Sequence, residues 1–161
     1  MTAFRFIHCS DLHIDSPFKG LASQVPSLTE RLRESTFQAF HKIVKLALEE
    51  KVDAVLIAGD IFDGADRSLQ AQLKFRRGLQ ELSQEGIPSF IVHGNHDPSN
   101  SWSHTLDWPE GTTIFPGNKV ERFPVMRGGK TLAWIYGISY PQKEVNENLA
   151  LKFNKDQKIG R

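Results

Sequence analysis

The chain has 161 residues, of which 39% are hydrophobic and 24% are charged, so its length and composition suit one domain with a buried core and exclude an intrinsically disordered protein. The 20 Lys and Arg residues are balanced by 19 Asp and Glu residues, which excludes a strong overall basic field and leaves only a local basic patch open. A single cysteine excludes a disulfide framework, and without a signal-peptide pattern or a long apolar stretch we expect a cytoplasmic protein with no membrane association.

Short apolar runs alternate with longer helical patterns along the first half of the chain. Residues 4–9 predict a strand, and a Ser-x-x-Glu capping box at Ser27 and Glu30 predicts the start of a helix. The apolar positions of this helix approximate a 3.6-residue repeat: Leu28, Leu32, Phe37, Phe40, Ile43, Val44, Ala47 and Leu48. Residues 53–58 then predict a buried strand.

A second helix is predicted over residues 68–85, followed by a strand at residues 89–92. Four leucines form its expected inner face: Leu69, Leu73, Leu79 and Leu82. The order strand, helix, strand, helix, strand predicts a parallel sheet with right-handed crossovers.

The pattern changes after residue 100. A short helix is expected within residues 102–108, and two strands at residues 119–126 and 131–140 flank a glycine-containing hairpin turn. We therefore expect an α/β fold whose sheet becomes mixed, with one more short helix around residues 145–153.

Polar motifs follow each of the three predicted apolar strands. Their residues are Asp11 and His13, then Gly59, Asp60 and Asp63, then Gly94, Asn95, His96 and Asp97. Because ligand sites of open parallel sheets form beyond the carboxyl ends of the strands, we expect these motifs to share one cleft. Carboxylate, imidazole and amide donors without thiolate suit Mn²⁺, Fe²⁺ or Zn²⁺, and a carboxylate such as Asp60 can bridge two cations about 3.5–4 Å apart.

Each motif alone is also compatible with an ordinary turn or a capped loop, and only their joint occurrence after three strands favours a metal pair. The remaining histidines and the cysteine have simpler interpretations. We expect structural roles for His8 and His93, a buried Cys9, and a packed or solvated His41. His104, with Trp102 and Trp108, could line a substrate groove, but core packing or a subunit contact explains these residues at least as well.

The three motifs resemble the first three signature blocks of the calcineurin-like metallophosphoesterases. Within them, residues 7–20 and 58–63 are similar to the SbcD/YhaO-type DNA repair exonuclease family, and the resemblance covers most of residues 4–140. The resemblance implies a layered α/β/β/α sandwich, of which this chain would form the N-terminal half.

The resemblance also implies roles for individual residues and a cofactor of two divalent cations, Mn²⁺ first, with Fe²⁺, Zn²⁺ and Mg²⁺ as alternatives. Four residues would bind metal: Asp11 and His13 the first ion, Asp60 both ions, and Asn95 the second through its amide oxygen. His96 would contact the phosphate and protonate the leaving oxygen, and we expect a hydrogen bond from Asp63 to fix its tautomer.

The family completes its site with a further histidine and a Gly-His-x-His block, whereas after Asp97 this chain has only His104, in a different context. We therefore expect residues 1–161 to be the N-terminal portion of a single nuclease domain, truncated before the last metal-binding blocks. Alone, it should bind metal weakly and be poorly active or inactive.

The function expected by resemblance is hydrolysis of a DNA phosphodiester by metal-activated hydroxide, as an exonuclease or endonuclease in double-strand-break repair. Alternatives are a phosphatase or cyclic-nucleotide phosphodiesterase of the same superfamily, or a non-catalytic fragment that binds a partner ATPase. The partners implied are DNA, an SbcC-type coiled-coil ATPase and a second copy in a homodimer. Candidate DNA contacts are Lys19, Arg67, Arg76 and Arg77, although a solvated helix face is the better interpretation of each one taken singly.

Overall fold

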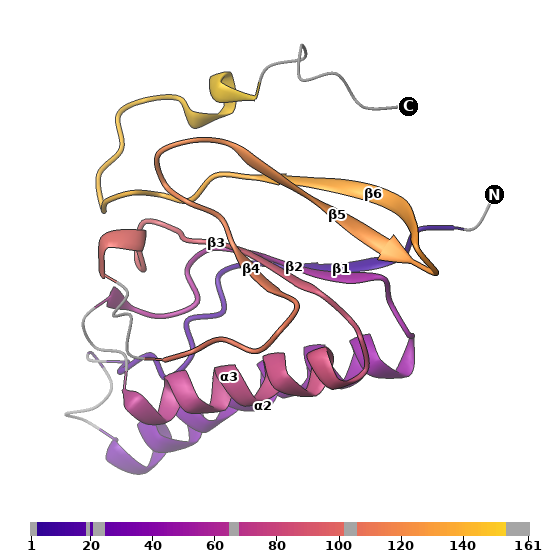
Figure 1. Ribbon diagram of the computed structural model, residues 1–161. Coiled ribbons are helices and arrows are strands. Elements are labelled where there is room, and N and C mark those ends of the chain that lie inside the picture. The colour runs from indigo at the N-terminus through magenta and orange to yellow at the C-terminus, as the bar shows by residue number, and fades with distance from the viewer. Residues whose placement is uncertain (1–2, 19, 21–24, 65–67, 102–105, 154–161) are drawn as a thin grey trace.

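A parallel sheet forms the centre of the computed structural model, which describes residues 3–18, 20, 25–64, 68–101 and 106–153 (Figure 1). Its strands lie in the order β1-β2-β3-β4 and all neighbours pair in parallel. The strands are β1 (Phe6–Cys9), β2 (Ala54–Ala58), β3 (Ser89–Val92) and β4 (Thr112–Ile114). The first three lie where the apolar runs predicted them, whereas β4, with only three residues, carries too short an apolar pattern to be predicted.

Helices α2 (Pro26–Glu49) and α3 (Leu69–Gln84) lie side by side on one face of the sheet (Figure 1). They connect β1 to β2 and β2 to β3, and crossovers of one hand that proceed in one direction across a sheet place their helices on the same face. Phe75 of α3 lies at the centre of the core beneath them, with ring centroids 5.0 Å from Phe40 and 5.7 Å from Phe62.

The first helix begins earlier than predicted. Val25 is its N-cap residue and makes no side-chain cap hydrogen bond, and Pro26 opens the first turn, so the capping box at Ser27 and Glu30 is wrong. Proline favours this position because its fixed φ suits a helix and its missing N–H would be unpaired there in any case. The predicted apolar stripe is largely confirmed by four buried residues, Phe37, Phe40, Val44 and Ala47, although Leu28 is 39% exposed.

The second helix begins where predicted, because the Ser68 side chain accepts a hydrogen bond from the backbone N–H of Ala71. Leu79 and Leu82 are buried as expected, but Leu69 and Leu73 are 64% and 47% exposed, so that part of the predicted inner face is wrong. Their places are taken by Ala71, Phe75 and Gly78. The small residues Ala71 and Gly78 let the two helices approach closely. The prediction missed them because it considered only the leucines.

A separate antiparallel sheet covers the opposite face of the parallel sheet (Figure 1). It consists of β5 (Glu121–Arg127) and β6 (Lys130–Gly137), which confirms the predicted hairpin, and the turn glycines have φ values of 56° and 77°. The expected antiparallel pairing is therefore present in a second sheet and does not extend the first. A second apolar cluster, Ala54, Phe90, Phe115 and Val125, fills the space between the sheets.

Two short 3-10 helices complete the described elements: η2 (Ser99–Ser101) and η3 (Leu149–Lys152), the latter within the region predicted to be helical at residues 145–153. Of the helix expected within residues 102–108, positions 102–105 lie outside the described residues, and 106–108 are not helical. None of the described helices has the length and apolarity needed to span a membrane.

Candidate metal centre

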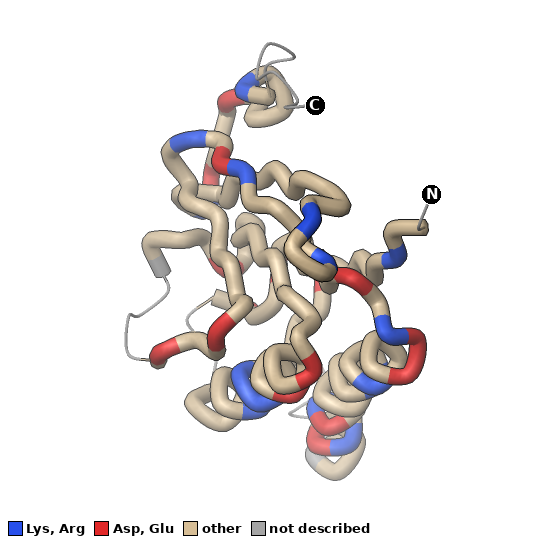
Figure 2. Tube along the Cα trace, turned by 45° about the vertical axis from the view of Figure 1, so that its right-hand side comes forward, with Lys and Arg blue, Asp and Glu red and all other residues tan. Residues whose placement is uncertain are grey.

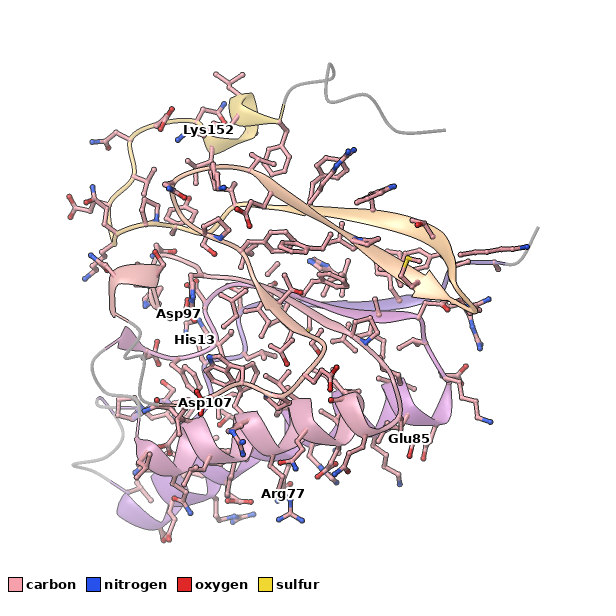
Figure 3. The ribbon with its side chains drawn as sticks, in the orientation of Figure 1. His13, Arg77, Glu85, Asp97, Asp107 and Lys152 are labelled. Carbon is pink, nitrogen blue, oxygen red and sulfur yellow. The ribbon has the colours of Figure 1, made fainter. Side chains whose placement is uncertain are left out.

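The three polar motifs follow β1, β2 and β3 at one end of the parallel sheet. Figure 3 shows His13, after β1, and Asp97, after β3, at this end, whereas Glu85 lies at the other. The three motifs therefore lie at the same end of the sheet, as the strand order predicted.

The loops after β1 and β2 are joined by backbone hydrogen bonds that continue the strand pairing. The Asp11 N–H donates to the Gly59 carbonyl at 3.1 Å, and the His13 N–H donates to the Asp60 carbonyl at 3.0 Å. Asp11, His13 and Asp60 have φ values of 55°, 42° and 51°, in the left-handed region that side-chain-bearing residues rarely adopt. Such conformations persist only where surrounding contacts hold them, and they concentrate at functional sites.

Asp11, His13 and Asp60 form a compact donor set. Each offers one ligand atom, and these atoms all lie within 4.8 Å of one another. Asp11 is exposed and the other two are half-buried, so the set is open to solvent. Two carboxylates and one imidazole, without thiolate, fit a divalent cation of the Mn²⁺, Fe²⁺ or Zn²⁺ type.

Asp63 contacts the imidazole of the donor set. Its Oδ1 lies 2.8 Å from Nδ1 of His13, which leaves Nε2 of that ring to face a cation. His96 is farther away, with Nδ1 3.6 Å from the same carboxylate oxygen and its ring edge-on to His13 at 5.3 Å. The hydrogen bond expected between Asp63 and His96 is therefore not formed, because His13 takes that position.

The surroundings of Asp63 keep its carboxylate ionised. Burial raises its pKa, but a hydrogen bond from Ser16, the contact with His13 and the proximity of His96 outweigh burial and lower the pKa overall. A negative charge is thus held beside Nδ1 of His13, where it orients the ring.

The third loop contacts the bridging candidate directly. The backbone N–H of His96 donates to Oδ1 of Asp60 at 2.9 Å. Asn95, the preceding residue, is exposed on the same loop. Its role as a ligand of a second ion, and the acid role of His96, remain predictions.

Asp97 has a role that the sequence did not indicate. It is completely buried, and its carboxylate accepts backbone N–H groups from Asp60 at 3.0 Å, Ile61 at 2.9 Å and Gly94 at 2.8 Å. Burial raises its pKa to about 6, and the negative charge of Asp60 adds to the rise, while the three N–H donors oppose it. The only signal in the sequence is an acidic residue directly after Gly-Asn-His.

The other candidates lie outside the donor set. Cys9 is half-buried against the core, and burial raises the pKa of its thiol to about 11, so the expected burial is met in part. His93 is buried and its backbone N–H donates to Ser139 Oγ at 2.9 Å, whereas His8 is exposed on β1. Trp108 packs edge-on against Phe75 at 6.0 Å, as core packing predicts. His41 is exposed on α2, and Trp102 and His104 lie outside the described residues.

Of the basic residues named as DNA contacts, the structure describes Arg76 and Arg77. Arg76 donates to the Asp107 carbonyl at 2.7 Å, and the side chain of Arg77 is 83% exposed beside Glu81. Figure 3 shows Arg77 pointing away from the sheet, and Figure 2 shows basic and acidic residues interspersed on both helices. Lys19 and Arg67 lie outside the described residues.

Comparisons with known proteins agree with this geometry. The family model described as calcineurin-like phosphoesterase matches residues 4–160. The chain is 37% identical over 155 residues to an uncharacterized metallophosphoesterase, YhaO, of Bacillus subtilis, an alignment that covers 96% of this chain and 38% of YhaO.

Two further relatives carry names that refer to DNA repair or to a nuclease. One is the DNA double-strand break repair protein Mre11 of Aeropyrum pernix, 32% identical over 63% of this chain and 23% of Mre11. The other is the SbcD component of the nuclease SbcCD of Escherichia coli, 31% identical over 64% of this chain and 24% of SbcD. The chain therefore spans well under half the length of each of these three relatives.

Proposed function

This chain belongs to the calcineurin-like phosphoesterase family, and on that premise we propose that it supplies the first metal-binding loops of a phosphodiesterase that acts on DNA ends. The observation that carries the proposal is the convergence of Asp11, His13 and Asp60, whose ligand atoms lie within 4.8 Å of one another at the carboxyl end of the sheet. Hydrolysis of a phosphate ester by this chemistry uses divalent cations at such a position.

Each donor has a distinct part in the proposal. Asp11 and His13 would hold one cation, Asp60 would bind both, and Asn95 would offer its amide oxygen to the second. When bound, the cations activate water for in-line attack on phosphorus and neutralise the charge that develops. Mn²⁺ is the proposed metal because the donors are carboxylate and imidazole, and Fe²⁺, Zn²⁺ and Mg²⁺ are the alternatives.

His96 is the proposed general acid. Its side chain is 49% exposed, and it lies next to His13 without being part of the donor set. Imidazole titrates near neutral pH, so His96 can give a proton to the leaving oxygen of a DNA phosphodiester. Nδ1 of His96 lies 3.6 Å from the carboxylate of Asp63.

DNA is the proposed substrate because two of the relatives are named for DNA break repair and for a nuclease. One of those names denotes one component of a larger nuclease, which supports a companion protein, and we propose an SbcC-type coiled-coil ATPase as the partner and a homodimer as the assembly. The cytoplasmic location expected from the sequence belongs to the same proposal.

The second cation needs more ligands than the described loops gather. Among the described His, Cys, Asp and Glu residues, one cluster of the required kind is present, and it contains a single imidazole. We propose that residues 1–161 are the N-terminal portion of one nuclease domain and that the missing imidazoles come from outside this sequence.

A chimera tests both proposals. The chain is fused to the part of YhaO that follows the aligned region, and chain and chimera are assayed with Mn²⁺ on linear duplex DNA, a cyclic nucleotide and a phosphorylated small molecule. We expect cleavage of linear DNA by the chimera and little or none by the chain alone.

The outcomes separate the alternatives. A chimera that binds Mn²⁺ but cleaves only the cyclic nucleotide or the phosphomonoester would contradict DNA as the substrate. Turnover by the chain alone at the rate of the chimera would contradict the proposal that further metal ligands come from outside this sequence. Absence of Mn²⁺ binding in both would favour a non-catalytic module.

A further inference from the structure

The buried carboxylate of Asp97 lies at the junction of the second and third loops. Its Oδ1 accepts the N–H groups of Asp60 and Gly94, and its Oδ2 accepts that of Ile61. Asp60 and Ile61 follow β2, whereas Gly94 follows β3. One side chain therefore ties the loop of the proposed bridging ligand to the loop of Asn95 and His96.

The two loops also approach each other too closely for a side chain at Gly59 or Gly94. A Cβ on Gly59 would lie 2.8 Å from the Cα of Gly94, and a Cβ on Gly94 would lie 2.7 Å from the backbone nitrogen of Asp60 and would overlap its carboxylate. In return, Oδ1 of Asp60 accepts the N–H of His96 at 2.9 Å. The glycines therefore allow the two loops to approach, and the carboxylates of Asp97 and Asp60 accept the backbone N–H groups that hold the loops together.

We infer that Asp97 is a positioning residue that fixes Asp60 and the Asn95–His96 loop in their metal-binding arrangement before any cation binds. The inference rests on the proposed function, because it assigns Asp60 and Asn95 as ligands. A carboxylate is suited to the task since both of its oxygens are acceptors only. An asparagine would have one acceptor oxygen, and its NH₂ group would face a backbone N–H donor.

A carboxylate at this place has a cost and a benefit. It is buried beside the carboxylate of Asp60, which costs stability, but an apolar side chain would leave the three backbone N–H groups without acceptors. The arrangement keeps the two loops in place, and a bound cation would offset the charges of both carboxylates.

The test compares Asp97→Asn with a matched control, Asp53→Asn. Asp53 is also a nearly buried carboxylate that accepts a backbone N–H, from Arg5 at 2.9 Å, but it precedes β2 at the end of the sheet away from the donor set. Two quantities are measured in the chain: amide hydrogen exchange at Asp60, Ile61 and Gly94 without metal, and Mn²⁺ affinity by titration calorimetry.

We expect Asp97→Asn to speed exchange at those three amides by roughly 10-fold or more, while the amides of α2 and α3 stay protected, and to weaken Mn²⁺ binding by about 10–100-fold. Asp53→Asn should lower the melting temperature and leave both quantities unchanged. Unaltered Mn²⁺ affinity in Asp97→Asn, or an equal loss in both variants, would overturn the inference.

Should Asp97→Asn fail to fold, Asp97→Glu keeps the acceptors but displaces them by one methylene group. The inference then predicts an affinity below that of the original chain, and unchanged affinity together with shifted Asp60 and Gly94 amide resonances would overturn it. If the original chain binds no Mn²⁺, the proposed function fails, while slow exchange at the three amides still decides whether Asp97 fixes the loops.

Discussion

Oδ1 of Asp63 lies 2.8 Å from Nδ1 of His13, fifty positions away in the chain. This contact fixes the orientation of the imidazole and presents Nε2 to the donor set. We predict that Asp63→Asn weakens Mn²⁺ binding by about 10–100-fold, because the carboxylate that holds Nδ1 of the ring is replaced by an uncharged amide. Titration calorimetry measures the effect.

The control for this prediction is His96→Asn, which removes the second imidazole near Asp63 without touching the donor set. Its Mn²⁺ affinity should equal that of the original chain. An equal loss of affinity in both variants would indicate a general disturbance of the cleft and contradict the specific role of Asp63.

His96→Asn should lower the rate of turnover. In the active chimera with YhaO, we predict a fall in kcat of about 10²–10⁴-fold with unchanged Mn²⁺ affinity, because only proton transfer to the leaving oxygen is lost. A DNA substrate with a leaving group that needs no proton should restore most of the rate. A fall of equal size on that substrate would exclude the acid role.

Asp53, at the other end of the sheet, should make the free energy of unfolding depend on pH. Burial raises its pKa, but the N–H of Arg5 and the guanidinium of Arg127 outweigh burial and lower the pKa overall. A carboxyl group whose pKa is lowered on folding stabilises the protein above its unfolded-state pKa of about 3.9, and this stabilisation is lost as the pH falls through the folded-state pKa.

We therefore predict that Asp53→Asn lowers the free energy of unfolding at pH 7, and that the difference from the original chain shrinks as the pH falls below about 4. Urea unfolding at several pH values measures it. A difference that stays constant or grows toward acid pH would show that the ion pair with Arg127 is not its source.

Gly78 of α3 packs against side chains of α2. A Cβ at this position would lie 2.5 Å from Cε1 of Phe40 and 3.1 Å from Cγ2 of Val44. Alanine gains about 1 kcal/mol of helix propensity, but overpacking of a core costs about 1–3 kcal/mol, so we predict a net loss of stability for Gly78→Ala. Thermal unfolding tests this against Gln80→Ala at an exposed position of α3, and a raised melting temperature for Gly78→Ala would contradict the packing.

The sheet and the donor set could be predicted because their signals are local. Each apolar run is followed directly by a polar motif, and parallel strands bring those motifs to one end, so the proximity of Asp11, His13 and Asp60 follows from strand order. The hairpin was predictable for the same reason, since its turn glycines lie between two apolar runs.

Partners within the site could not be predicted from residue types. Whether Asp63 contacts His13 or His96 depends on the backbone path of three loops, and that path includes residues in the left-handed region, which side-chain-bearing residues rarely adopt. The burial of Asp97 depends likewise on the close approach of two glycines in the loops that follow β2 and β3. The start of α2 was predicted one residue late because Pro26 and the Ser27–Glu30 capping box are both good starting signals, and the sequence alone does not rank them.

The most direct test of the metal centre is a crystal structure with Mn²⁺ and its anomalous difference map. The account predicts a peak about 2–2.3 Å from a carboxylate oxygen of Asp11, a carboxylate oxygen of Asp60 and Nε2 of His13, with Asp63 still on Nδ1. No peak at saturating Mn²⁺, or a peak away from these three side chains, would contradict it.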